Sequence, residues 1–124
     1  MAGTDNMLLH IDTIVADGVA LEIEDASATI SGAMGYTNAT VMAASGNDAQ
    51  KRQRVARLLK CNLLFTGGVS VAQLEAMQNI QITARDSKSG RRALMPVCSI
   101  AEVGDIGSGP VAVTFNVLQP IQWL

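Results

Sequence analysis

Apolar and polar residues alternate along most of this chain, and a period of two predicts β-strands. The clearest example is 111–119, in which Val111, Val113, Phe115 and Val117 share one face. Other segments alternate in the same way, and the strands predicted from them are 7–16, 19–24, 26–31, 57–65, 79–86 and 91–103. We therefore expect a mainly β fold, either a β-sandwich or a barrel.

A tight turn precedes the strand predicted over 19–24. The dipeptide Asp17-Gly18 favours a two-residue hairpin, because a type I′ turn needs positive φ at both central positions. Within 19–24, Glu22 and Glu24 fall on the face that meets solvent or a water-filled space.

The strand predicted over 91–103 contains a proline. Proline has no N–H to donate to a ladder, so Pro96 indicates a sheet edge or a bulge. Alternation places Leu94, Pro96, Cys98 and Ile100 on the inner face of this strand.

One short segment has helical spacing instead. Val71, Leu74 and Met77 form a narrow apolar stripe within 70–78, and Ser70 is a good N-cap. A helix of this length is not stable by itself. We expect it to cover apolar surface at the open end of the sheet structure.

The segment 32–53 is rich in glycine and polar residues and stands outside the alternating pattern. A loop of this length is uncommon in a compact domain unless it has a function. We expect 33–50 to form either an extended arm that packs on a neighbouring subunit or a surface loop that folds back on its own domain. The C-terminal tail 120–124 contains the only tryptophan, Trp123, next to Leu124, and we expect it to dock on its own domain or on another copy.

Charge is distributed unevenly along the chain. Residues 1–50 contain seven acids and no lysine or arginine, whereas 51–124 contain nine basic residues and four acids, so their net charges are −7 and +5. If the fold keeps these halves apart, their faces favour head-to-tail association of identical copies. If the halves interleave, the asymmetry cancels. The basic run 51–57 either meets solvent or pairs with the acidic half of a neighbour.

The composition fits one domain spanning 1–124, with 48% hydrophobic and 3% aromatic residues. No apolar run approaches the ~20 residues of a membrane-spanning helix, and the N-terminus has no basic region before an apolar stretch. We therefore expect no membrane association, and we expect Cys61 and Cys98 to be reduced during folding. These cysteines are either buried small hydrophobic residues or partners in a disulfide formed later, including one between subunits.

No pattern in the sequence indicates an enzyme. The one histidine, His10, has no partner at metal-ligand spacing, and the two cysteines do not form a Cys-x-x-Cys pair. The glycine-rich stretch 104–109 lacks the Gly-Lys-Ser/Thr of a P-loop, and no Gly-x-Ser-x-Gly elbow occurs. We expect neither catalysis nor a metal or cofactor.

Three stretches, which together with the order of elements cover most of 14–119, carry a family resemblance. The first runs from Ala16-Asp-Gly-Val through Thr-Ile-Ser-Gly32, and the second from Lys60-Cys-Asn-Leu through Gly67-Gly68 to the predicted helix. The third is Asn79-Ile-Gln-Ile-Thr-Ala-Arg-Asp86, followed by a Ser-Gly turn. These stretches resemble the tail tube proteins of contractile-tailed bacteriophages, in particular the small Mu-like branch. Residues 32–54 and the tail do not match this pattern closely.

The resemblance implies a β-sandwich or barrel with one helix, assembled as stacked hexameric rings into the inner tail tube through which the genome is ejected. It implies a place in the virion tail after assembly in the host cytoplasm, with sheath, baseplate and tail terminator proteins as partners. DNA passes through the lumen without specific binding, and phosphate repulsion favours an acidic or neutral lumen. Glu22 and Glu24 are therefore candidate lumen residues. Candidate contacts between subunits, rings or sheath are Met34, Tyr36, Val41, Met42, Lys51, Arg52, Arg54, Arg57, Trp123 and Leu124.

Two alternatives stay open. The tube protein of a related contractile injection or secretion machine has the same fold but passes no genome. A monomeric β-barrel binding module, with its pocket under the helix, belongs to a different functional class.

Overall fold

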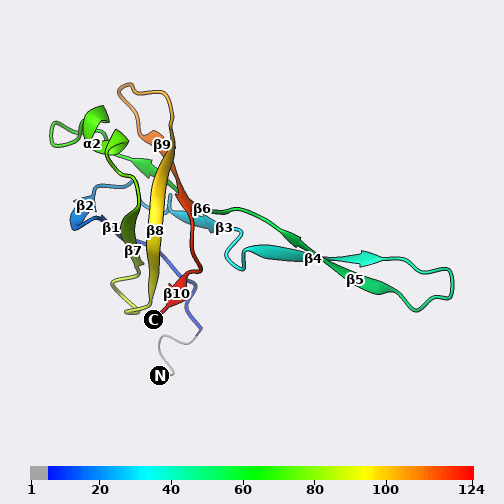
Figure 1. Cartoon of the computed structure of the whole chain (residues 1–124). Helices are drawn as coiled ribbons and strands as arrows, with labels where there is room; N and C mark the ends of the chain where they lie inside the picture. The colour runs from blue at the N-terminus through cyan, green and yellow to red at the C-terminus, as the bar shows by residue number, and fades with distance from the viewer. Residues whose placement is uncertain (1–5) are drawn as a thin grey trace.

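The computed structural model describes residues 6–124, so residues 1–5 of the expected single domain lie outside the described range. Within that range the chain forms β-strands and one short helix (Figure 1). Their bounds are β1 Thr13–Ala16, β2 Val19–Leu21, β3 Thr29–Ser31, β4 Tyr36–Val41, β5 Ala49–Arg54, β6 Arg57–Leu63, α2 Val71–Glu75, β7 Ile80–Arg85, β8 Arg92–Val103, β9 Val111–Val117 and β10 Gln122–Trp123. The prediction of a mainly β fold with a short helix is confirmed.

Most strands belong to one antiparallel sheet in the order β2-β1-β7-β8-β9-β6-β3. Near the C-terminus, β10 pairs with the first part of β8, where Gln122 lies opposite Leu94. The strands β4 and β5 form a separate two-stranded sheet, which projects far from the rest of the chain in Figure 1. We call the large sheet with α2 the body, and we call β4, β5 and the turn between them, residues 36–54, the arm.

The sheet of the body curls until the segment after β2, at one end of the sheet, contacts β6, the strand next to β3 at the other end. Just after β2, Ile23 forms an isolated bridge with Leu63 of β6. Glu24 donates its N–H to the carbonyl of Asn62, and Leu64 donates to the carbonyl of Glu22, both at 2.8 Å. So short a contact does not close a full barrel. The body is therefore an open, barrel-like sheet.

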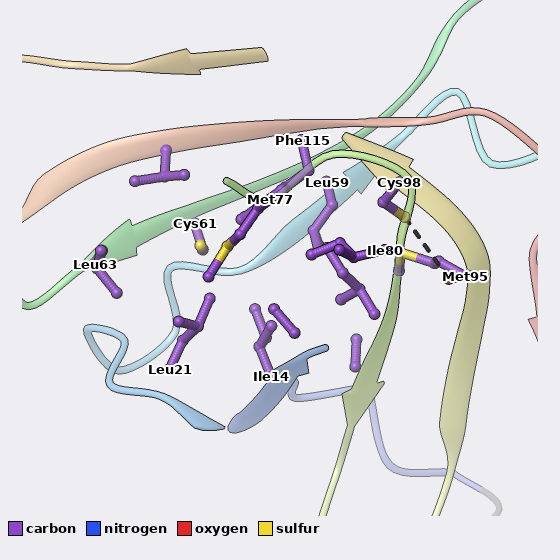
Figure 2. Packing of buried hydrophobic residues seen from close by; sticks show 14 of the residues in the cluster. Ile14, Leu21, Leu59, Cys61, Leu63, Met77, Ile80, Met95, Cys98 and Phe115 are labelled. Carbon is purple, nitrogen blue, oxygen red and sulfur yellow. Dashed lines mark hydrogen bonds between the residues drawn. The ribbon is translucent and has the colours of Figure 1, made fainter. Parts of the chain in front are cut away.

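Aliphatic side chains fill the interior of this curled sheet. Ile14, Leu59 and Phe115 are fully buried, and Figure 2 shows them within one cluster. Burial of apolar surface contributes about 25 cal/mol per Å², so this cluster is the main source of the body's stability. The alternation predicted for β6, β7 and β9 is confirmed, and their buried residues are Leu59, Cys61, Leu63, Ile80, Ile82, Ala84, Val111, Val113, Phe115 and Val117.

The predicted helix is present but short. The Ser70 hydroxyl accepts from the backbone N–H of Gln73 at 3.2 Å, which confirms the N-cap. Leu74 is fully buried and Met77 nearly so. The prediction that Val71 joins them is wrong, because Val71 is 41% exposed. The helix ends at Glu75, so only its last turn and the residues just after it cover the core.

The predicted inner face of β8 is wrong over the first half of the strand. Ala93 and Met95 are buried there, whereas Leu94 and Pro96 are only half-buried. Between the pairs Ile82–Met95 and Ile80–Cys98, β8 advances three residues while β7 advances two. The bulge contains Pro96, as its missing N–H predicts, and the extra residue reverses which side chains face the core.

The strand predicted over 7–16 begins only at Thr13. Upstream of it, the backbone N–H of His10 donates to the carboxylate of Asp86 at 3.2 Å. The carboxylate of Asp12 accepts from the backbone N–H of Ser87 at 3.1 Å. Side-chain carboxylates therefore join this segment to the β7–β8 turn, and of its backbone only the N–H of Asp12 bonds to β7, at 3.0 Å to the carbonyl of Arg85. The Asp17-Gly18 hairpin is confirmed, since both residues have positive φ, of 50° and 79°.

Candidate assembly surfaces

The arm buries almost no surface on its own chain. Every residue of β5 is exposed, and so are four of the six residues of β4. The segment predicted as an arm or a loop over 33–50 is a hairpin with wider bounds, because the basic residues at 51–54 form its return strand. A two-stranded sheet without a core is only marginally stable in water. The arm is therefore the part of this chain that gains most from a partner surface.

The register of the arm separates two faces. Tyr36 pairs with Arg54 and Asn38 pairs with Arg52, and residues directly opposite one another in antiparallel strands lie on the same face. The guanidinium carbon of Arg52 lies 4.2 Å from the centre of the Tyr36 ring, a cation–π contact that holds the arginine over this face. We call this side the arginine face. The opposite face carries Thr37, Ala39, Val41, Ala49, Lys51 and Gln53.

Apolar side chains that were predicted to contact other subunits are exposed. Met34, Val41 and Met42 are 62%, 48% and 81% exposed. Met42 follows β4 at the far end of the arm, whereas Met34 precedes β4 at its base. These side chains are accessible for contacts outside their own chain, as the prediction requires.

The base of the arm is tightly packed against the body. Gly32 has a φ of +64°, and a Cβ on it would overlap the backbone oxygen of Ala56. Val55 donates its N–H to the carbonyl of Gly35 at 3.0 Å. Arg57, predicted as a contact residue, is half-buried against Gly35, and its Nε is buried without a hydrogen-bond partner. Arg57 thus belongs to the arm's support and not to its accessible surface.

Glu22 and Glu24 are exposed, as predicted for the solvent face of their segment. Between them, Ile23 is half-buried and packs against the core. Glu24 accepts a hydrogen bond at 2.9 Å from the side-chain amide of Asn62, near the end of β6. These carboxylates therefore lie at the end of β6 that is far from the arm.

The C-terminal tail docks on its own body through backbone bonds. Leu124 and Arg92 exchange N–H to carbonyl bonds of 2.9 and 3.1 Å. The side chains of Trp123 and Leu124 are nevertheless 53% and 62% exposed. Trp123 borders a shallow apolar cavity of about 310 Å³, whose other lining residues are Leu9, Ile11, Ala28, Thr29, Ile30 and Ala33. Of the two predicted docking modes, the tail uses its own domain and leaves the ring of Trp123 accessible.

The two cysteines are far apart in the core (Figure 2). Cys61 pairs with Val113 and Cys98 with Val117 on opposite sides of β9. Two strand spacings and four residues separate them by roughly 15 Å, whereas a disulfide needs Cα atoms within about 7 Å. The alternative that these two cysteines form a disulfide within one chain is therefore wrong. Both thiols are buried, and burial raises the pKa of each to about 11, which suits the alternative role of small core residues.

One buried carboxylate, which the sequence did not indicate, stabilises the body at the β7–β8 turn. Asp86 is 3% exposed and accepts from the backbone N–H groups of His10, Lys88 and Ser89, at 3.1 to 3.3 Å. These hydrogen bonds, with the bond from His10 first, lower the pKa of Asp86 to about 2. Asp86 thus ties the N-terminal segment to the β7–β8 turn. An aspartate before a Ser-Lys-Ser-Gly turn could have indicated the turn contacts, but not the contact with His10.

His10 has one side-chain partner that its sequence neighbourhood did not predict. Its Nε2 lies 3.0 Å from a carboxylate oxygen of Asp25. Both border a cavity of about 460 Å³ beside the β7–β8 turn, away from α2. Across residues 6–124, no three His, Cys, Asp or Glu side chains are grouped so that they could hold a metal ion. No helix in this same range has the length and apolar character to cross a membrane.

Comparison of the chain with protein-family models gave no matching family, and comparison with curated proteins gave no match.

Proposed function

We propose that this protein is a structural subunit of a phage tail tube, which assembles as stacked hexameric rings into the conduit for genome ejection. The proposal combines the resemblance of 14–119 to contractile-tail tube proteins with the shape of the chain. In this role the protein acts by association with copies of itself, with sheath, baseplate and tail terminator proteins as further partners.

The arm is the observation that carries the proposal. A monomeric domain gains nothing from a long hairpin that leaves both of its faces in water. In a ring or a stack of rings, a neighbouring copy can cover that hairpin. The open edges of the curled body sheet support the same reading, since an assembly can cover the edges that a monomer must protect.

The proposal leaves two places for Glu22 and Glu24. In the lumen, their carboxylates would repel phosphate and keep the genome from adhering to the wall. At a contact between copies, they would meet basic groups. Both places require exposed side chains, which these glutamates have.

Mass photometry and negative-stain electron microscopy over a concentration series test the proposal. We expect a species of about six copies, or hollow polymers of one diameter, as the concentration rises. A chain that stays monomeric at high concentration, with and without a tail initiator complex, would overturn the ring assembly.

The monomeric binding module has less support. That reading expects a pocket under the helix, but Leu74 and Met77 occupy the space between α2 and the core. The larger cavity, of about 460 Å³, is instead lined by residues of the N-terminal segment and the β7–β8 turn. The injection-machine tube shares every feature used here, and packaged DNA in the particle that contains this protein would separate the two tubes.

A further inference from the structure

The arginine face of the arm has no acidic partner within its own chain. Arg52 and Arg54 are exposed, and among residues 6–124 neither forms an ion pair. The cation–π contact with Tyr36 already restricts the Arg52 side chain, so less conformational entropy is lost when it binds an anion. The face is thus prepared for a negatively charged surface that this copy does not supply.

The body carries two carboxylates with matching spacing. Glu22 and Glu24 are two residues apart in an extended segment, and both are exposed. Arg52 and Arg54 are also two residues apart, on one face of β5. Side chains two residues apart on one face of an extended strand repeat at roughly 7 Å. Two guanidinium groups can therefore face two carboxylates at the same repeat.

The arm cannot reach these carboxylates in its own chain. Arg57 begins β6 at the base of the arm, whereas Asn62, the partner of Glu24, lies five residues further along that strand. The backbone of β6 between Arg57 and Asn62 spans about 16 Å. The arm continues from the Arg57 end of β6 and extends away from the body, as Figure 1 shows. The arginines of the arm and the two carboxylates thus lie at opposite ends of the molecule.

We propose that Arg52 and Arg54 of one copy bind Glu22 and Glu24 of the next copy. This inference rests on the proposed assembly, and it assigns the two glutamates to a contact between copies and not to the lumen. The contact joins different surfaces of two identical molecules, so it is head-to-tail. Such contacts continue from copy to copy and close into rings when the rotation between copies allows it.

Charge reversal on each side tests the contact. The variant Arg52→Glu/Arg54→Glu and the variant Glu22→Arg/Glu24→Arg should each raise the concentration for half-assembly at least about tenfold, because facing like charges repel. The matched control for the arm is Gln53→Glu, which adds a negative charge to the same strand but on the opposite face. The control for the body is Glu102→Arg/Asp105→Arg, at exposed positions on and just after β8. Both controls should assemble within about threefold of the wild type.

Mixing the two reversed variants in equal amounts gives the decisive measurement. In alternating order, each glutamate-bearing arm meets an arginine-bearing body, and each arginine-bearing arm meets a glutamate-bearing body. The mixture should therefore assemble at near wild-type concentration, as should a single chain that carries all four changes. Thermal melting of each variant alone shows that its body is folded, so that lost assembly is not lost folding.

Other outcomes of these experiments would overturn either the proposed contact or the proposed assembly. If the wild type assembles but the reversed variants also assemble, or the mixture fails, the arm–carboxylate contact is wrong and the tube proposal stands. If Arg52→Glu/Arg54→Glu instead abolishes binding of duplex DNA in a gel-shift assay while assembly is unchanged, the arginine face binds phosphate. A wild type that never assembles overturns the proposed assembly itself.

Discussion

The body and the arm are both antiparallel sheets, but their side chains have different surroundings. In the body, alternate residues of β6 and β9 meet in a core where Leu59 and Phe115 are fully buried. In the arm, cross-strand pairs such as Ala39–Lys51 leave both faces accessible to water. The body is thus stabilised within one chain, whereas the arm gains burial only against a second surface. This division separates the part that folds the molecule from the part that we propose joins it to other copies.

Truncation of the largest core residue should have the largest effect. Phe115→Ala leaves a cavity beside β6 and should lower the free energy of unfolding by about 3–5 kcal/mol, measured by urea denaturation of dilute monomer. Val41→Ala on the arm is the comparison, and it should change this free energy by no more than about 0.5 kcal/mol. A comparable loss from Val41→Ala would mean that the arm packs on its own body in solution.

A substitution at the base of the arm should have an intermediate effect. Gly32→Ala combines a φ of +64° with overlap of the Ala56 oxygen, so we expect a loss of about 1–3 kcal/mol. It should also speed hydrogen exchange at the N–H of Val55, which bonds to Gly35 across this base. Gly46→Ala at the arm's tip has positive φ but open space around it, and should cost only about 1 kcal/mol. Equal losses at the two glycines would show that the base is not tightly packed.

The smallest effect should be a change in how stability depends on pH between pH 4 and pH 2. The pKa of Asp86 in the folded protein is about 2, below the ~3.9 of an unfolded aspartate. Its carboxylate therefore stabilises the fold fully above about pH 4, and this stability is lost as the pH falls towards 2. Asp86→Asn should make the urea midpoint fall less between pH 4 and pH 2 than it does in the wild type. Asp105→Asn, on the exposed β8–β9 loop, should keep the wild-type profile, and an unchanged profile in Asp86→Asn would contradict the assigned role.

Local alternation was enough to predict the inner faces of β6, β7 and β9, because each of these strands keeps a regular register. The same rule failed in the first half of β8, because one extra residue at Pro96 changes which alternate side chains face the core. No local pattern shows on which side of the bulge the alternation is reversed. The limits of the arm were also missed. Which residues pair with 36–41 depends on contacts across the hairpin, so the basic run at 51–54 looked like a separate segment.

The candidate surfaces could be predicted only where local sequence determines them. The exposure of Glu22, Glu24 and the arm's arginines follows from their polarity, and the structure agrees. The half-burial of Arg57 and the contact of Asp86 with His10 depend on residues brought together only by folding. The position of Glu24 near the end of β6 that is far from the arm likewise comes from sheet topology, which the sequence does not show.

The basic strand β5 also affects how arms meet other arms. A solitary hairpin has two unpaired edges, and identical hairpins at high concentration tend to pair with one another and aggregate. Each arm carries Lys51, Arg52 and Arg54 against the single acid Asp48, so two arms brought together repel. A carboxylate-bearing surface meets no such repulsion. The positive charge that would bind a carboxylate surface of another copy thus also disfavours pairing between two arms.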